Sequence, residues 1–90
     1  MDNDDGKVRV ADEIRRYCRD NYVLPSKKNT QLVVAIKSGE VHEQLSFKNR
    51  LPAICSVLGS RSFEEDNNII RIAIDGPLNG ASTIFVYKLL

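Results

Sequence analysis

The C-terminal segment constrains this chain most, because it pairs two strand-like runs around one turn-forming loop. Residues 69–75 read IIRIAID and residues 83–90 read TIFVYKLL, with GPLNGAS between them. Glycine, proline and asparagine favour turns, so the segment predicts a β-hairpin. In the first run Ile70, Ile72 and Ile74 alternate with other residues, which predicts that they form its core face. The second run is apolar at nearly every position, which predicts the more central strand.

A hairpin alone is only marginally stable in water, so it needs a further strand or a packed helix. Residues 31–37, QLVVAIK, are a short β-branched run bounded by polar residues, which predicts that strand. The chain has 90 residues, 42% of them apolar, enough for one small core. We therefore expect a three-stranded antiparallel sheet in a single domain.

The N-terminal part of the chain predicts one amphipathic helix, over residues 8–21. Val10, Ile14 and Cys18 recur every four residues and define one apolar stripe. Leu24-Pro25 is expected to end the helix, since a residue before proline avoids helical geometry. Residues 26–30, SKKNT, then form a polar loop, and residues 1–7, rich in aspartate, form a disordered N-terminus.

Two short helices are predicted in the middle of the chain, over residues 39–45 and 50–59. Ser38 is a suitable N-cap for the first. The second has a core stripe and an outward face; the stripe is Leu51, Ile54, Cys55 and Leu58, and the outward face is Arg50, Ala53, Ser56, Val57 and Ser60. Pro52 is tolerated in its first turn. Residues 60–68 are read as a polar connection.

These elements predict an α+β fold in which three helices pack on the small sheet, in the order helix, strand, helix, helix, strand, strand. One domain covers residues 8–90. This order is similar to that of the winged helix-turn-helix superfamily. The helix-turn-helix would be SGEVHEQLSFKNRLPAICSVLGS, residues 38–60, and the wing would be residues 75–83. The resemblance implies a domain that binds double-stranded DNA, whose second motif helix enters the major groove and whose wing contacts phosphate or the minor groove.

The residues of that second helix are suited to such a role. Ala53 and Ser56 are small enough to let a helix approach base edges. Arg50 suits a bidentate contact to guanine and Asn49 one to adenine, at the helix start where base-reading side chains commonly lie. We therefore expect DNA contacts at Lys48, Asn49, Arg50, Ala53, Ser56, Ser60 and Arg61, with Lys27, Lys28, Lys37 and Asn79 as further phosphate contacts.

The distribution of charge along the chain supports DNA contact at these residues more than the net charge of +1 does. Residues 25–62 carry six basic side chains against two acidic ones, whereas the segments on either side are slightly acidic. A few phosphate contacts give weak, salt-sensitive affinity. We therefore expect a homodimer or a larger complex, acting as a transcriptional regulator or as the DNA-targeting subunit of an assembly.

The expected wing has no lysine or arginine, and Leu78 lies near its tip. Leu78 can contact a protein instead of DNA. A protein–protein interaction module within a larger complex is therefore the alternative function, and the sequence leaves both open.

Other chemistries are not expected. His42 has no partner at metal-ligand spacing, and no catalytic constellation or cofactor motif is present, so we expect neither an enzyme, a metal site nor a small-molecule cofactor. Cys18 and Cys55 are expected to be buried free thiols in a reducing cytoplasm, with a redox pair as the less favoured reading. No apolar run is long enough to cross a membrane, and the acidic N-terminus is not a secretory signal.

Overall fold

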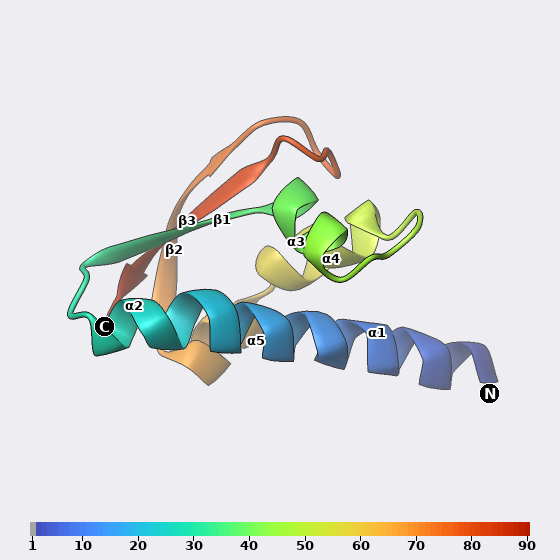
Figure 1. Cartoon of the computed structure of the whole chain (residues 1–90), viewed down its shortest axis with the longest axis horizontal. Helices are drawn as coiled ribbons and strands as arrows, with labels where there is room; N and C mark the ends of the chain where they lie inside the picture. Colours follow the sequence, from blue (N-terminus) through green and yellow to red (C-terminus); the bar gives the residue numbers. More distant parts are fainter. Residues whose placement is uncertain (1) are drawn as a thin grey trace.

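The first third of the chain is one continuous helical run in the computed structural model, which describes residues 2–90. It comprises α1 (Asp2–Cys18), a π-helical turn η1 (Arg19–Val23) and α2 (Leu24–Lys28) (Figure 1). The predicted end at Leu24-Pro25 is therefore wrong, and so is the predicted loop at residues 26–28. A π turn directly precedes Pro25, so the backbone is already widened there and the helical run continues past the proline.

The helix also begins earlier than the sequence predicts. Its first residue is Asp2, so α1 includes most of the segment, residues 1–7, that was expected to be disordered. Whether residues 8–90 form the folded domain by themselves stays a prediction.

The sheet contains the three predicted strands, and they pair as predicted. It contains β1 (Val33–Lys37), β2 (Ile69–Asp75) and β3 (Ile84–Leu89), in the antiparallel order β1-β3-β2. Ile36 lies opposite Phe85, and Val34 lies opposite Tyr87. All four are buried and form the inner face of the sheet, against which the helices pack. The more apolar strand, β3, is the central one, as expected.

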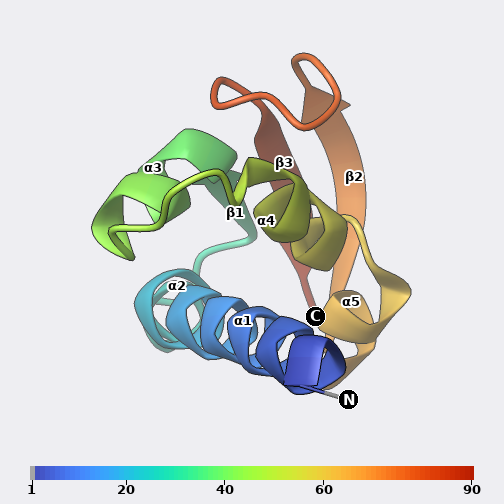
Figure 2. The same ribbon diagram turned by 90° about the vertical axis from the view of Figure 1, so that its right-hand side faces the viewer.

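Three helices lie between β1 and β2, one more than the sequence predicts. They are α3 (Ser38–Gln44), α4 (Leu51–Leu58) and α5 (Arg61–Asn67) (Figure 2). The expected polar connection over residues 60–68 is wrong, because Ser60 caps α5 by accepting a hydrogen bond from the Phe63 N–H, at 3.3 Å. Phe63 is fully buried, so tertiary packing stabilises this otherwise polar helix. The fold is thus α+β, with more helices than the predicted order contains.

The core stripe of α4 is largely as predicted. Ile54, Cys55 and Leu58 are buried, and Leu51 is half-buried. Val57 was expected to face outward, but only 4% of it is exposed. The reason is that α1 packs against α4 and covers this side of the helix, so two sides of α4 are buried instead of one.

The expected core face of the first hairpin strand is wrong. Ile70, Ile72 and Ile74 are 47%, 55% and 50% exposed, and Ile69 is the buried residue of β2. Ile70 lies opposite Lys88, on the outer face of the sheet. A register irregularity between Arg71 and Ala73 breaks the simple alternation further along.

Ser38 does not cap α3, whose N-cap is Lys37. The Ser38 hydroxyl donates to the carbonyl of Gly80 at 2.5 Å, and its N–H donates to the carbonyl of Thr83 at 2.9 Å. The Gly39 N–H donates to the Ala81 carbonyl at 2.9 Å, and a Cβ at Gly39 would collide with that carbonyl. The start of α3 is therefore attached to residues 76–83, which we call the hairpin loop.

Candidate nucleic-acid interface

An open groove lies between α1 and α4, with a volume of about 410 Å³. One wall is formed by Ala11 and Arg15 of α1. The other wall includes five of the predicted contact residues: Asn49, Arg50, Ala53, Ser56 and Ser60. The structure therefore brings together nearly half of the residues that the sequence nominates; we call this groove the α4 groove.

The turn before α4 leaves its basic residues free. It spans residues 45–50, longer than predicted, and Ser46 and Asn49 adopt left-handed backbone geometry in it. The Arg50 N–H donates to Nε2 of His42 at 3.2 Å, so the imidazole supports the backbone where α4 begins. The side chains of Lys48, Asn49 and Arg50 are exposed.

Those cations are not used in ion pairs. Over residues 9–90 the ion pairs are Arg15–Asp12, at 3.0 Å, and Arg19–Asp20, at 3.3 Å. Neither Lys48 nor Arg50 takes part in them, so both charges are available to a partner. Lys48 and Arg50 therefore do not have to give up an ion pair before they contact a partner, and exposed ion pairs are weak in any case.

The two serines of the α4 groove differ in what they do. The Ser60 hydroxyl donates to the Val57 carbonyl at 2.7 Å and accepts from Phe63, so it serves the fold as a cap. Ser56 is exposed, and its hydroxyl makes no side-chain hydrogen bond within residues 9–90. Of the pair, Ser56 is the one whose hydroxyl is free for a ligand.

Four further basic residues lie away from the α4 groove. The Lys27 ammonium donates to the carbonyls of Asn67 and Asn68, at 2.6 and 3.3 Å, where it caps the end of α5. Lys28 is exposed at the end of α2. Lys37 lies opposite Ile84 on the outer sheet face, and Arg61 borders a pocket that Glu64 and Glu65 share. The structure does not gather these four with Arg50.

The hairpin loop lies on the other side of α4. Asn79 lines a mainly apolar cavity of about 290 Å³, together with Cys55 and Ser56 of α4. Leu78 lines the same cavity and is 91% exposed, the largest exposed fraction among the bulky apolar residues of the described chain. Figure 2 shows α4 between this loop and α1.

Arg15 is the charged residue of the α4 groove that the sequence did not nominate. Its partners in α4 are remote in sequence, so spacing along the chain could not reveal the contact. The signal that was present is the cluster Arg15, Arg16 and Arg19, which places three cations close together on one helix.

The remaining chemistry-bearing side chains belong to the core. Cys18 and Cys55 are free and buried, and burial raises the pKa of the Cys18 thiol to about 12. Tyr87 is fully buried, and its hydroxyl donates to the Leu58 carbonyl at 2.5 Å. Burial raises the pKa of Tyr87 well above its ordinary value. The Tyr22 hydroxyl likewise donates to Glu40, at 2.5 Å.

Comparison of the chain with family models, with curated proteins and with solved structures finds no match. Among residues 2–90, no helix is both long and apolar enough to span a membrane.

Proposed function

We propose that this protein binds double-stranded DNA through the α4 groove and acts as a transcriptional regulator or as the DNA-targeting subunit of a complex. It is proposed as a non-enzymatic domain of the winged helix-turn-helix type. In that assignment α3 and α4 form the helix-turn-helix and the hairpin loop takes the place of the wing.

The observation that carries the proposal is the α4 groove itself. It joins an arginine and an asparagine at a helix start to small side chains one and two turns later. Arginine and asparagine are the side chains that read guanine and adenine edges, and small neighbours permit close approach. Lys48 stands exposed in the adjoining turn, where it can contact phosphate.

The sheet order β1-β3-β2, with α3 and α4 between β1 and β2, supports the assignment of domain type. Two features differ from the simple expectation. α5 follows α4 before the sheet resumes, and the hairpin loop is attached to α3 rather than projecting freely. The proposal therefore gives the reading role to α4 and assigns the hairpin loop a supporting position.

The test is fluorescence anisotropy of the chain with a mixed-sequence duplex, first at low salt and then near physiological salt. Binding should weaken linearly in log–log form as salt rises, since phosphate contacts release counterions. Arg50→Ala should weaken binding to a selected site by about 1–3 kcal/mol and relax preference at one base pair. The backbone N–H of that position still donates to His42, so the turn is retained.

Lys88→Ala is the matched control, because Lys88 is exposed on the outer sheet face, away from α4. It removes one cation without touching the groove. Equal losses of duplex affinity from both variants would mean that binding depends on overall charge and not on the α4 groove. No binding by the unaltered chain at low salt would reject the proposal.

A second function is favoured by a separate observation, the exposed apolar residues of the sheet. Val33 and Ile70 flank Lys88 on the outer face and are 50% and 47% exposed, and Leu78 is nearly fully exposed in the hairpin loop. Bulky apolar side chains held in water are available for contacts with a protein partner. A protein–protein interaction module is therefore the alternative, and Ile70→Asp should abolish capture of a stable partner while leaving duplex binding unchanged.

A further inference from the structure

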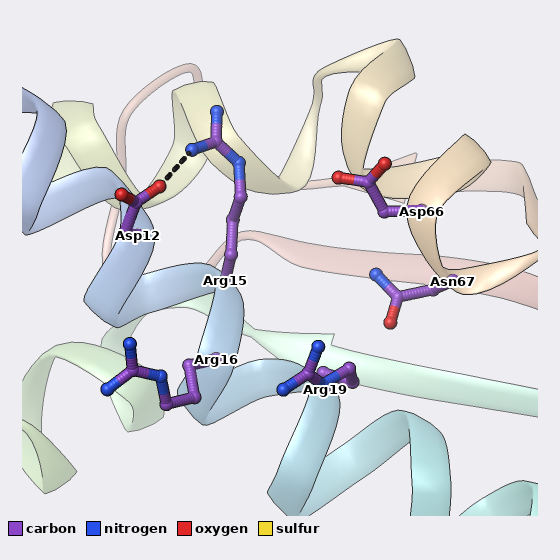
Figure 3. A pocket seen from close by; sticks show the side chains of 6 residues that line it. All are labelled: Asp12, Arg15, Arg16, Arg19, Asp66 and Asn67. Carbon is purple, nitrogen blue, oxygen red and sulfur yellow. Dashed lines mark hydrogen bonds and ion pairs between the residues drawn. The ribbon is translucent and has the colours of Figure 1, made fainter.

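A second pocket continues along α1 beyond the α4 groove, with a volume of about 280 Å³. One wall comprises Asp12, Arg15 and Arg16 of α1 with Arg19 of η1, and the other wall comprises Asp66 and Asn67 of α5. Figure 3 shows these side chains, with the Asp66 carboxylate turned toward α1. We call this the arginine pocket. It lies outside the set of residues that the sequence nominated.

The charges of the arginine pocket are not fully neutralised within the protein. Arg15 is paired with Asp12 through one nitrogen, and Arg19 is paired with Asp20, which is exposed. Arg16 has no ion-pair or hydrogen-bond partner among residues 9–90. Asp66 has none either, and it is the one carboxylate on the α5 wall. The three guanidinium groups therefore exceed the carboxylates that line the pocket.

Two buried polar atoms of this pocket lack hydrogen-bond partners. One is Nε of Arg15, a donor, and the other is Oδ1 of Asn67, an acceptor. Asn67 is only 8% exposed, and its Nδ2 donates to the Phe63 carbonyl at 2.8 Å, which fixes the orientation of the amide. Buried polar atoms are nearly always paired. Both of these atoms are closed to solvent, so a polar ligand in the pocket reaches them only when the two side chains turn toward it.

The arginine pocket and the α4 groove form one track. Arg15 lines both. Along the opposite wall, Ser60 borders the α4 groove where α5 begins, and Asn67 borders the arginine pocket where α5 ends. The distance along the helical run from Ala11 to Arg19 is about 12 Å at the usual rise of an α-helix, longer than the spacing of successive phosphates along one strand.

We propose that the sugar–phosphate backbone of DNA bound at α4 runs along this track, with Arg15, Arg16 and Arg19 as its phosphate contacts. The inference rests on the proposed function. Phosphate oxygens accept hydrogen bonds from guanidinium groups in a bidentate manner, and they supply the acceptor that Arg15 Nε lacks once this side chain turns toward the pocket. A water molecule that hydrates the phosphate can donate to Oδ1 of Asn67.

Substitutions on the two walls of the arginine pocket should change DNA binding in opposite directions. Arg16→Ala and Arg19→Ala should each reduce the slope of log affinity against log salt by about 0.9, and the double variant by about 1.8. Asp66→Asn removes the repulsive carboxylate and should raise the affinity about threefold at low salt. Lys88→Ala, on the outer sheet face, should leave the slope nearly unchanged. Circular dichroism of each variant checks that the helices are retained.

The outcomes separate this inference from the proposed function. The unaltered chain can bind DNA with an affinity that falls as salt rises, while Arg16→Ala and Arg19→Ala leave that dependence unchanged. This result would overturn the phosphate contacts along the track and leave DNA binding at the α4 groove intact. If those variants reduce the slope and Arg50→Ala does nothing, the track stands and the reading role of α4 is overturned. If the unaltered chain does not bind at all, both are overturned.

Discussion

The two faces of the sheet both carry apolar residues, but one face is buried and the other is exposed. On the inner face Phe85, Tyr87 and Ile36 are packed beneath the helices. On the outer face Val33 and Ile70 are half exposed, although they are as apolar as their inner neighbours. The difference comes from the helices, which cover one face only. Apolar character therefore does not decide burial here; the placement of covering elements does.

This comparison also separates the two proposed functions in space. The α4 groove and the arginine pocket lie on the helical side of the sheet, whereas the exposed Val33 and Ile70 lie on the other side. The protein can therefore hold DNA on one side while a protein partner occupies the other. Substitutions on the two faces should have independent effects, since distant sites contribute additively.

The strongest test of the comparison is a matched pair of truncations. Phe85→Ala should lower the free energy of unfolding by about 3–5 kcal/mol, because it leaves a cavity in the packed inner face. Ile70→Ala should lower it by less than about 1 kcal/mol, because its side chain is already half in water. Urea denaturation measures both. Similar losses would mean that the outer face is covered in solution, which would contradict the exposed sheet.

A second prediction concerns the hydrogen bond buried behind the inner face. Tyr87→Phe removes the donor to the Leu58 carbonyl and leaves that acceptor unpaired, so it should cost about 1–3 kcal/mol. Tyr17→Phe is the control, because the Tyr17 hydroxyl makes no hydrogen bond within residues 9–90. Thermal unfolding of the two variants should show a clear shift for the first and little for the second.

The third prediction is a pH dependence set by the core. Because burial raises the pKa of Cys18 from about 9.0 to about 12, the folded chain holds that proton more tightly than the unfolded chain. The stability that this thiol contributes is fully present below pH 9 and is lost progressively as pH rises toward 12. The contribution of this thiol to the unfolding free energy should fall by roughly 1 kcal/mol between pH 8 and pH 10. Cys18→Ala, referred to its own value at pH 8, should lose that part of the fall and retain only the part due to Tyr22 and Tyr87, whose pKa values burial also raises.

The smallest effect separates a structural serine from a ligand-facing one. Ser60→Ala removes the cap of α5 and should cost about 1 kcal/mol of stability. Ser56→Ala lies on the exposed side of α4 and should leave stability unchanged or slightly higher, since alanine favours helices. DNA affinity should respond in the opposite way, with the larger loss at Ser56. A stability loss at Ser56 would show that this side chain belongs to the packed region.

Local patterns in the sequence were enough to place most elements. The alternating and β-branched runs located all three strands, and the strongly apolar residues 83–90 identified the central one. The stripe of α4 followed from spacing alone, because a 3.6-residue period fixes which side chains share a face. The basic residues and asparagine at the start of that helix were likewise read from position, and three-dimensional packing brought five nominated residues into one groove.

Several errors arose where a distant segment decided the outcome. Ser38 resembles an N-cap locally, but the carbonyl of Gly80 takes its hydroxyl. Val57 is outward by spacing, but α1 covers it. α5 is too polar to be predicted, and its helix depends on the burial of Phe63 and on the Lys27 cap from α2.

The sequence by itself thus determined the sheet, its central strand and the residues that begin and line α4, because hydrophobic period and turn chemistry are local properties. Only the tertiary structure decided which face of the hairpin is buried, which serine caps and which is free, and that Arg15 of α1 faces α4. Those features depend on which segments meet in space. Which segments meet is set by the packing of the whole core, so no short stretch of sequence indicates it.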